Sequence, residues 1–433
     1  MPERAPVTMS ATLAADEALA RRRRAGERVL SLASGEIGLS VLPSLRERLA
    51  AAADRNSYGS VPGSLALRTA AAGYWARRGL ATDPALVVCG PGSKPLLFAL
   101  LLAIGGDVLI PVPSWVSYGA QARLAGARPI PVPIIPGEGG VPDPLALREA
   151  VARARAARRD PRCVVVTVPD NPTGTIAEPE TVRRLGEAAR DLDLVVVSDE
   201  IYGDLVFDPA GRAASPALYA PERTVVTTGL SKNLALSGWR LGVARLPDGP
   251  LGRELHNRLV AVASQIWSST AAPVQAAAAY AFEEPPEVAR HIAACRRLHE
   301  VVAREVARRF TEAGAAPAPV RATCYLYPDF TPLGDHLDRV HGVRGGGELA
   351  ALLADRYGVA VLPGTAFGEP ERALRIRIAT GRLYGESDAE RVAAPSAADP
   401  LQLPWIEESL DRITEVLADL TGSVAGRRTD ARH

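Results

Sequence analysis

Short apolar, β-branched runs alternate with helix-like stretches through the middle of the chain. The runs lie at residues 86–89, 107–113, 163–168, 193–199, 224–228 and 239–246. Between them, apolar residues recur with a period of about 3.6, which is typical of helices that cover a core. Strands that alternate with helices in this way favour a largely parallel sheet with helices on its faces. The pattern therefore predicts an α/β fold.

The two ends of the chain lack this alternation. We predict three parts: an N-terminal arm at 1–45, a large domain at 46–290 and a smaller α+β domain at 291–433 that the arm joins. A polar stretch near 381–404 has the character of an insertion. The amphipathic pattern of residues 405–420 predicts one last helix after it.

Composition narrows the class of protein. The 433 residues are 47% hydrophobic and 23% charged, with a formal net charge of +1, as in a soluble globular protein. So balanced a charge argues against nucleic acid or an anionic membrane as partner. Residues 95–104, the richest apolar run, are too short to span a bilayer, and no signal-peptide core follows the arginines at 21–24. We expect a cytoplasmic protein.

The cysteine and histidine positions do not suggest a disulfide framework, a metal site or a histidine-based catalytic triad. The four cysteines show no CxxC spacing, so we expect buried free thiols in a reducing compartment. The six histidines lie away from the motifs below. A metal site or a histidine-based triad is therefore not expected.

Lysine usage is the most unusual feature. Of 50 basic residues only Lys94 and Lys232 are lysines. Arginine has no nucleophilic amine at neutral pH, whereas a desolvated lysine can lose its proton and form a Schiff base. Chance accounts adequately for Lys94 by itself. Lys232 lies in the distinctive segment TVVTTGLSKNLALSGWRLG at 224–242, and we interpret it as a functional amine.

Polar residues follow the predicted strands, and the carboxyl ends of parallel strands meet at one edge of a sheet. The turn Gly92-Ser93-Lys94 opens a helix whose free N–H groups could hold a phosphate. Trp115 could stack on a planar ring, and Arg240 could pair with a phosphate. Taken singly, these are an ordinary turn, a core tryptophan and a surface charge. Their order and spacing together are more specific.

Four motifs make the chain resemble the fold-type I pyridoxal-phosphate (PLP) enzymes, and among them the aspartate aminotransferase-like class I/II aminotransferases. They are NPTG at 171–174, DEIY at 199–202, SKNLALSGWRLG at 231–242 and VAVLPGTAFG at 359–368. The resemblance implies a large PLP-binding domain with a mostly parallel sheet, a smaller domain, and a homodimer with shared active sites.

The resemblance also implies roles for individual residues. Lys232 would bind PLP as a Schiff base and act as general base, and Asp199 would pair with the pyridine nitrogen. Asn171 and Tyr202 would hydrogen-bond the phenolic oxygen, and Trp115 would stack on the ring.

Phosphate and substrate contacts follow by position. Gly92, Ser93, Lys94, Ser231 and Arg240 would bind the phosphate. Tyr58 would reach the phosphate of the neighbouring subunit.

The substrate's α-carboxylate would bind Arg375 in a bidentate pair, with the backbone of Gly35 close by. For Arg377 we favour a surface ion pair.

Some positions depart from the family pattern. Gly229 stands three positions before the lysine, where many members carry a hydroxyl residue. The segment VRATCY at 320–325 stands where the family commonly has P-x-G-a-F-Y, and GEIGL at 35–39 stands where it has GEPDF. With the 381–404 stretch these make four departures, and the resemblance implies that three of them would lie near the substrate.

We therefore predict transamination between an α-amino acid and a 2-oxo acid. The alternative is a PLP enzyme of specialised metabolism that catalyses elimination or substitution at Cβ or Cγ, cyclisation or oxidation. A non-catalytic cofactor-binding regulator and a dinucleotide enzyme fit less well, because there is no DNA-binding segment, basic patch or GxGxxG motif.

Overall fold

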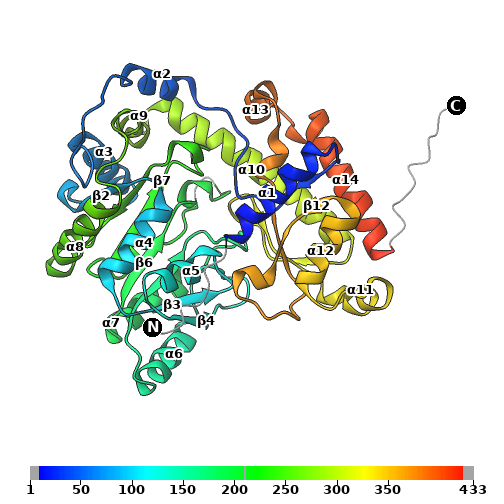
Figure 1. Ribbon diagram of the computed structural model, residues 1–433, viewed down its shortest axis with the longest axis horizontal. Helices are drawn as coiled ribbons and strands as arrows, with labels where there is room; N and C mark the ends of the chain where they lie inside the picture. The colour runs from blue at the N-terminus through cyan, green and yellow to red at the C-terminus, as the bar shows by residue number, and fades with distance from the viewer. Residues whose placement is uncertain (1–8, 209–210, 423–433) are drawn as a thin grey trace.

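A seven-stranded sheet forms the centre of the larger part of the molecule (Figure 1). The computed structural model describes residues 9–208 and 211–422. Neighbouring strands are parallel except at β8, which runs antiparallel to both β2 and β7. In spatial order the strands are β2 (Val87–Gly90), β8 (Gly242–Arg245), β7 (Thr224–Gly229), β6 (Val195–Asp199), β5 (Pro161–Thr167), β3 (Asp107–Val112) and β4 (Pro129–Pro133). The predicted α/β fold class is confirmed.

Every apolar run that predicted a strand forms one, and the edge strand β4 is the strand that was missed. Its sequence, Pro-Ile-Pro-Val-Pro, carries prolines at alternate positions. Proline cannot donate to a sheet ladder and so argues against a central strand. At an edge the missing donors face outward, and β4 pairs along β3 alone.

Helices cover both faces of the sheet because the side chains of each strand alternate between them. In β3, Val108 and Ile110 pack in one apolar cluster, whereas Leu109 packs in the opposite one. The first face carries α4 (Ser93–Ile104), α5 (Ser117–Leu124) and α8 (Pro250–Ile266); the second carries α6 (Pro144–Ala156) and α7 (Pro179–Asp191). A third cluster joins α2 (Pro43–Ala51), α3 (Leu65–Ala76) and α9 (Ala272–Glu283) to the β2 end of the sheet.

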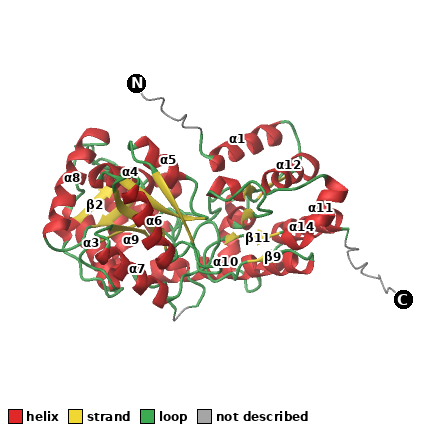
Figure 2. Cartoon of the chain, turned by 90° about the horizontal axis from the view of Figure 1, so that it is seen from below, coloured by secondary structure: helices red, strands yellow, loops and turns green. Residues whose placement is uncertain are grey.

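The C-terminal part is built on α10 (Pro286–Glu312) and small sheets (Figure 2). Strand β14 (Ile376–Ala379) lies between β10 (Tyr325–Leu326) and β13 (Leu362–Pro363), and β11 (Pro328–Asp329) pairs with β9 (Ala316–Pro317). The remaining helices here are α11 (Gly334–His341), α12 (Gly346–Tyr357), α13 (Asp388–Ala393) and α14 (Pro404–Thr421). Helix α14 is the predicted last helix, and α13 lies within the 381–404 stretch.

The N-terminal segment packs against this C-terminal part. Strand β1 (Leu30–Ser31) pairs in parallel with β12 (Val359–Ala360), and Arg22 of α1 (Ala11–Arg24) donates a hydrogen bond to the Ala354 carbonyl of α12. Figures 1 and 2 both show α1 beside α12. The domain limits at 45 and 290 stay predictions. None of the helices in the described ranges has the length and apolar character needed to cross a bilayer.

Candidate active site

A cavity of about 430 Å³ lies at the carboxyl ends of the central strands and reaches the N-terminal segment. Most of the residues predicted to act together line it. They are Gly35, Lys94, Trp115, Asn171, Asp199, Tyr202, Ser231, Lys232 and Arg240. Tyr118, Tyr325 and Arg377 also line it, and the predictions had not placed them there.

The hairpin between β7 and β8 carries Lys232 and Arg240. It closes at the pair Gly229 and Gly242. A Cβ at Gly229 would lie 2.7 Å from the Leu241 oxygen, and one at Gly242 would lie 2.5 Å from the Ser93 nitrogen. The two glycines therefore let the hairpin pack closely against the start of α4. A hydroxyl side chain at Gly229, as in the family pattern, would require the main chain at Leu241 to move away.

Lys232 projects from this hairpin into the cavity. Its Nζ donates a hydrogen bond to the main-chain oxygen of Gly35 at 2.5 Å. A Cβ on Gly35 would lie 2.5 Å from the Tyr325 Oη, so only glycine fits at this point of the N-terminal segment. The amine of Lys232 has no carboxylate partner among the described residues.

Two further cations lie near Lys232. Burial and the charges of Arg240 and Lys232 lower the pKa of Lys94, whose Nζ lies 5.1 Å from the centre of the Trp115 ring. Arg240 donates a hydrogen bond to the Ser237 carbonyl at 2.8 Å, and its guanidinium occupies the space that a Cβ on Gly92 would fill. Within the described ranges, neither Lys94 nor Arg240 forms an ion pair. Together with the open N-terminus of α4, these cations fit a phosphate group.

Asp199 lies at the end of β6 and is 4% exposed. Its Oδ2 accepts a hydrogen bond from the Tyr118 hydroxyl at 3.0 Å, and its Oδ1 accepts one from the Thr227 hydroxyl at 3.2 Å. Burial raises the pKa of Asp199 to about 6, although both hydrogen bonds lower it. A buried carboxylate of this kind fits a protonated ring nitrogen, whose positive charge would stabilise the ionised form.

Asn171 connects two parts of the site through hydrogen bonds. Its Nδ2 donates to the Tyr202 hydroxyl at 3.2 Å, and the Tyr202 and Tyr325 hydroxyls lie 3.1 Å apart. Its Oδ1 accepts from Arg377 at 3.3 Å. These groups form a polar wall that reaches from the large sheet to β14.

Arg377 is buried, with 1% of its surface exposed. Its guanidinium lies 4.8 Å from the Tyr325 ring centre and 5.2 Å from that of Phe367. It also donates to the Ala33 carbonyl, and its Nε has no partner among the described residues. A buried guanidinium that faces a cavity without a carboxylate partner is suited to bind one from a ligand.

Comparison with known proteins gives the family. Residues 27–383 match the sequence model of the family described as aminotransferase class I and II. The chain belongs to this family, which uses PLP. It is an aminotransferase.

Relatives of this aminotransferase support the assignment. It is 32% identical over 396 residues to a probable aspartate/prephenate aminotransferase of Thermus aquaticus, covering 89% of this chain and 96% of the relative. It is 30% identical over 398 residues to the aspartate aminotransferase of Geobacillus stearothermophilus, covering 90% and 96%.

Solved structures agree. An aspartate aminotransferase from Thermus thermophilus with maleate superposes with a TM-score of 0.79 at 28% identity, over 95% of this chain and 97% of the other. An N-succinyldiaminopimelate aminotransferase from Mycobacterium tuberculosis gives a TM-score of 0.78 at 27% identity, over 95% and 98%.

The two arginines of the LRIRIA segment are arranged differently from the prediction. Arg375 does not line the cavity; it pairs with Asp329 at 2.9 Å and with Glu369 at 2.7 Å. Arg377, for which a surface ion pair was predicted, is buried in the cavity wall, so that prediction is wrong. The period of two places both arginines on one face, and the carboxylates beside Arg375 retain it outside the site of this aminotransferase.

Tyr58 lies in an exposed loop, has 91% of its surface exposed and does not line the cavity of its own chain.

Tyr118 donates a hydrogen bond to Asp199, and the sequence analysis did not predict this contact. It follows Trp115 by three positions, and their ring centres lie 5.2 Å apart. The three-residue spacing from Trp115 was the feature of the sequence that could have predicted Tyr118 as a residue of the site.

Proposed function

We propose that this aminotransferase holds PLP in the cavity through Lys232 and transfers an amino group between an α-amino acid and a 2-oxo acid. One observation carries the proposal: the half-buried Lys232 and the buried Asp199 line one cavity together with Lys94 and Arg240, two cations that form no ion pair among the described residues. When bound there, PLP would supply the electron sink for negative charge that develops at the substrate Cα.

The residues of the chain would divide the remaining tasks. Lys94, Arg240, Ser231 and the first amides of α4 would hold the phosphate, and Trp115 would lie against the ring. Asp199 would keep the ring nitrogen protonated, because an ionised carboxylate stabilises a proton on its partner.

The polar wall would orient the substrate. Arg377 would bind the α-carboxylate, and its hydrogen bond to Asn171 would fix the direction of the guanidinium. Once the substrate's own amine has taken the place of Lys232 on PLP, the freed Nζ would remove the proton from Cα as general base.

The relatives support a donor class. Several are named aspartate aminotransferases. We include in the proposal that a dicarboxylic amino acid such as aspartate is the donor. We further propose a cytoplasmic homodimer in which Tyr58 reaches the partner's phosphate site; the exposure of Tyr58 and the four buried free thiols support this.

A half-reaction screen tests the proposed function. The protein is loaded with PLP, and single amino acids are added without any 2-oxo acid. Stoichiometric conversion of the bound cofactor to its amine form, with one oxo acid released, is the expected result, and aspartate should react faster than alanine or lysine. Ammonia release with unchanged cofactor would contradict transamination. The Lys232→Ala variant is the matched control.

A further inference from the structure

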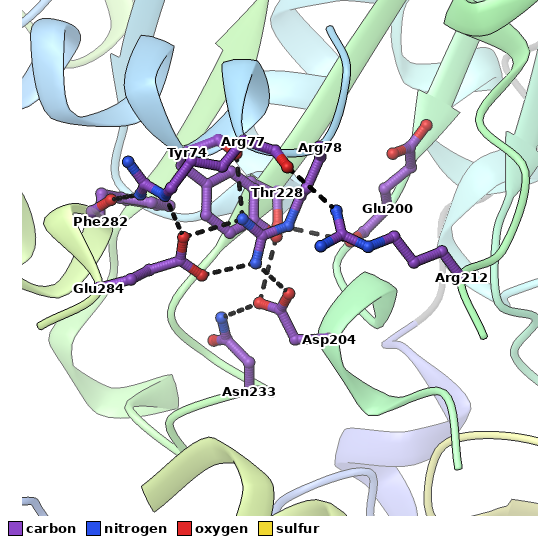
Figure 3. Close-up of polar contacts among 10 residues, drawn as sticks. All are labelled: Tyr74, Arg77, Arg78, Glu200, Asp204, Arg212, Thr228, Asn233, Phe282 and Glu284. Atoms are coloured by element: carbon purple, nitrogen blue, oxygen red, sulfur yellow. Dashed lines mark hydrogen bonds and ion pairs between the residues drawn. The ribbon is translucent and has the colours of Figure 1, made fainter. Parts of the chain in front are cut away.

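A partly buried ionic cluster, drawn in Figure 3, includes a contact with Asn233, the residue after Lys232, and its charged residues do not line the active-site cavity. Arg78, just after the end of α3, pairs with two carboxylates, Asp204 and Glu284, each at 2.6 Å. Its guanidinium lies 3.4 Å from the centre of the Tyr74 ring. The cluster thus joins α3, the end of α9 and the turn that follows Tyr202.

Asp204 extends this cluster to the active site. Besides Arg78, it accepts hydrogen bonds from the Tyr74 hydroxyl at 3.1 Å and from the Asn233 Nδ2 at 2.8 Å. Asn233 is the residue after Lys232 and is 4% exposed. Its Oδ1 is buried without a partner among the described residues, so the bond to Asp204 is the polar contact that orients its side chain.

The main chain around Lys232 combines long and ordinary hydrogen bonds. Ala235 N to Lys232 O measures 3.4 Å and Leu230 N to Leu241 O measures 3.5 Å, at the long end of the range, whereas Leu236 N to Leu230 O measures 3.0 Å. Ala235 also has a positive φ of 54°, a conformation that costs a non-glycine residue energy. The hydrogen bond between Asn233 and Asp204 adds a side-chain anchor to this strained segment.

We propose that Asp204 is a positioning residue for Lys232: through Asn233 it fixes the segment that aims the lysine amine into the cavity, and Arg78 holds Asp204 in place. Asp204 does not line the active-site cavity, so it acts through Asn233 alone. The inference rests on the proposed function in one respect, that Lys232 is the residue that binds PLP.

Glu284 provides a matched control. It pairs with the same guanidinium as Asp204 and also with Arg77, but among the described residues no hydrogen bond joins it to Asn233. Asp204→Asn and Glu284→Gln therefore remove the same kind of charge from Arg78, and only the first changes the anchor of Asn233. The side chains of Arg78 and Glu284 keep 22% and 17% of their surface exposed, so water can solvate the guanidinium in either variant.

The first experiment measures PLP retention and the pH midpoint of the visible absorbance of the bound cofactor. We expect Asp204→Asn to retain PLP about tenfold less tightly, the worth of one buried hydrogen bond to a charged group, and to shift the midpoint, whereas Glu284→Gln should resemble the wild type. Equal shifts in both variants would reduce Asp204 to a structural residue and overturn the inference. If Asp204→Asn does not fold, Asn233→Ala keeps both ion pairs and should show the same shift.

A charge exchange gives a rescue test. The double variant D204N/N233D restores a carboxylate-to-amide hydrogen bond with the two partners reversed. It should recover most of the lost PLP affinity, whereas N233D alone should be worse than D204N because two carboxylates would then face each other. Failure of the double variant to recover more than either single change would contradict the proposed contact.

A measurement without cofactor separates this inference from the proposed function. Because the chain has only two lysines, reductive methylation with ¹³C-formaldehyde labels Lys94, Lys232 and the N-terminal amine alone. In Asp204→Asn the Lys232 signal should move or broaden while the Lys94 signal stays. An unmoved Lys232 signal would overturn the inference even if PLP binds, and a protein that binds no PLP would overturn the proposed function whatever this signal does.

Discussion

The side-chain amine of Lys232 lies 2.5 Å from the main-chain oxygen of Gly35, although 197 residues separate them in the sequence. Gly35 belongs to the N-terminal segment, which packs against the C-terminal part, whereas Lys232 belongs to the large sheet. The amine therefore lies where the two parts of the molecule meet. This carbonyl accepts a hydrogen bond from the lysine amine.

Replacing Lys232 tests the covalent attachment of PLP. Lys232→Ala should abolish the visible absorbance of a lysine-bound cofactor, whereas Lys94→Arg should keep it with weaker phosphate affinity. Borohydride reduction followed by peptide mass spectrometry identifies the modified lysine, with only two candidates in the chain. Label on Lys94 would refute the assignment.

Asp199 makes stability depend on pH. Burial raises its pKa to about 6 in the folded protein, above the ordinary 3.8. Between these values the folded state keeps a proton that the unfolded state has released, so the free energy of unfolding falls as pH rises through this window. Burial also raises the pKa values of Asp170 and Glu200 to about 7, which extends the fall in the same direction.

The Asp199→Asn variant should remove one part of this effect. Without PLP it should be more stable than the wild type at pH 8, by about 1–3 kcal/mol from the pKa difference, and no more stable at pH 4. With PLP it should turn over far more slowly. Thermal unfolding at both pH values checks the first expectation; a stability difference independent of pH would contradict it.

Arg377 and Arg375 provide a matched pair. Arg377→Ala should lower kcat/KM for amino acids by the equivalent of about 2–4 kcal/mol, mainly through a higher KM, because a bidentate partner for the α-carboxylate is lost. Arg375→Ala should affect kcat/KM much less but lower the Tm, since it leaves Glu369 and Asp329 without their cation. The reverse ranking in kinetics would return the carboxylate to Arg375.

Tyr118→Phe isolates the hydroxyl that donates to Asp199. Because this hydrogen bond lowers the pKa of Asp199, its removal should raise that pKa and move the acid limb of PLP binding to higher pH. We expect kcat to fall about tenfold, the worth of one hydrogen bond to a charged group. Binding titrations between pH 5 and 8 measure the shift, and an unchanged acid limb would exclude Tyr118 from this role.

Subunit mixing tests the role of Tyr58. If each active site takes Tyr58 from its partner and Lys232 from its own chain, Tyr58→Ala and Lys232→Ala proteins should each be impaired, while their mixed dimers regain one intact site. Activity should therefore rise on mixing, after time for subunit exchange. No recovery in a verified mixed dimer would place Tyr58 outside the partner's site.

Prediction from the sequence was most accurate where a chemically distinctive motif follows the apolar pattern of a strand. Lys232 and Asp199 follow apolar runs that form β7 and β6, so strand ends and motifs placed them in one cavity without coordinates. Strand β4 was missed because its three prolines are compatible only with an edge strand, and the sequence does not show which segment forms the edge of the sheet. Local pattern decides what a segment forms, but its neighbours decide where it lies in the sheet.

Contacts between distant segments set the remaining limit. Arg375 and Arg377 are equivalent by period, and only Asp329 and Glu369, brought beside Arg375 by folding, distinguish them. The same holds for Asn233, whose partner Asp204 lies 29 positions earlier in a turn that looked unremarkable. Electrostatic partners of this kind carry no local signature.

The antiparallel pairing of β7 with β8 has a consequence for cofactor release. Because Gly229 faces Gly242, residues 230–241 form one closed loop that contains both Lys232 and Arg240. The covalent and the ionic anchor of PLP would therefore belong to a single cooperative unit that opens or closes as a whole. Hydrogen exchange of this loop should then slow when PLP binds, and the cofactor should dissociate no faster than the loop opens, so that the lifetime of the holoenzyme reports the opening of one hairpin.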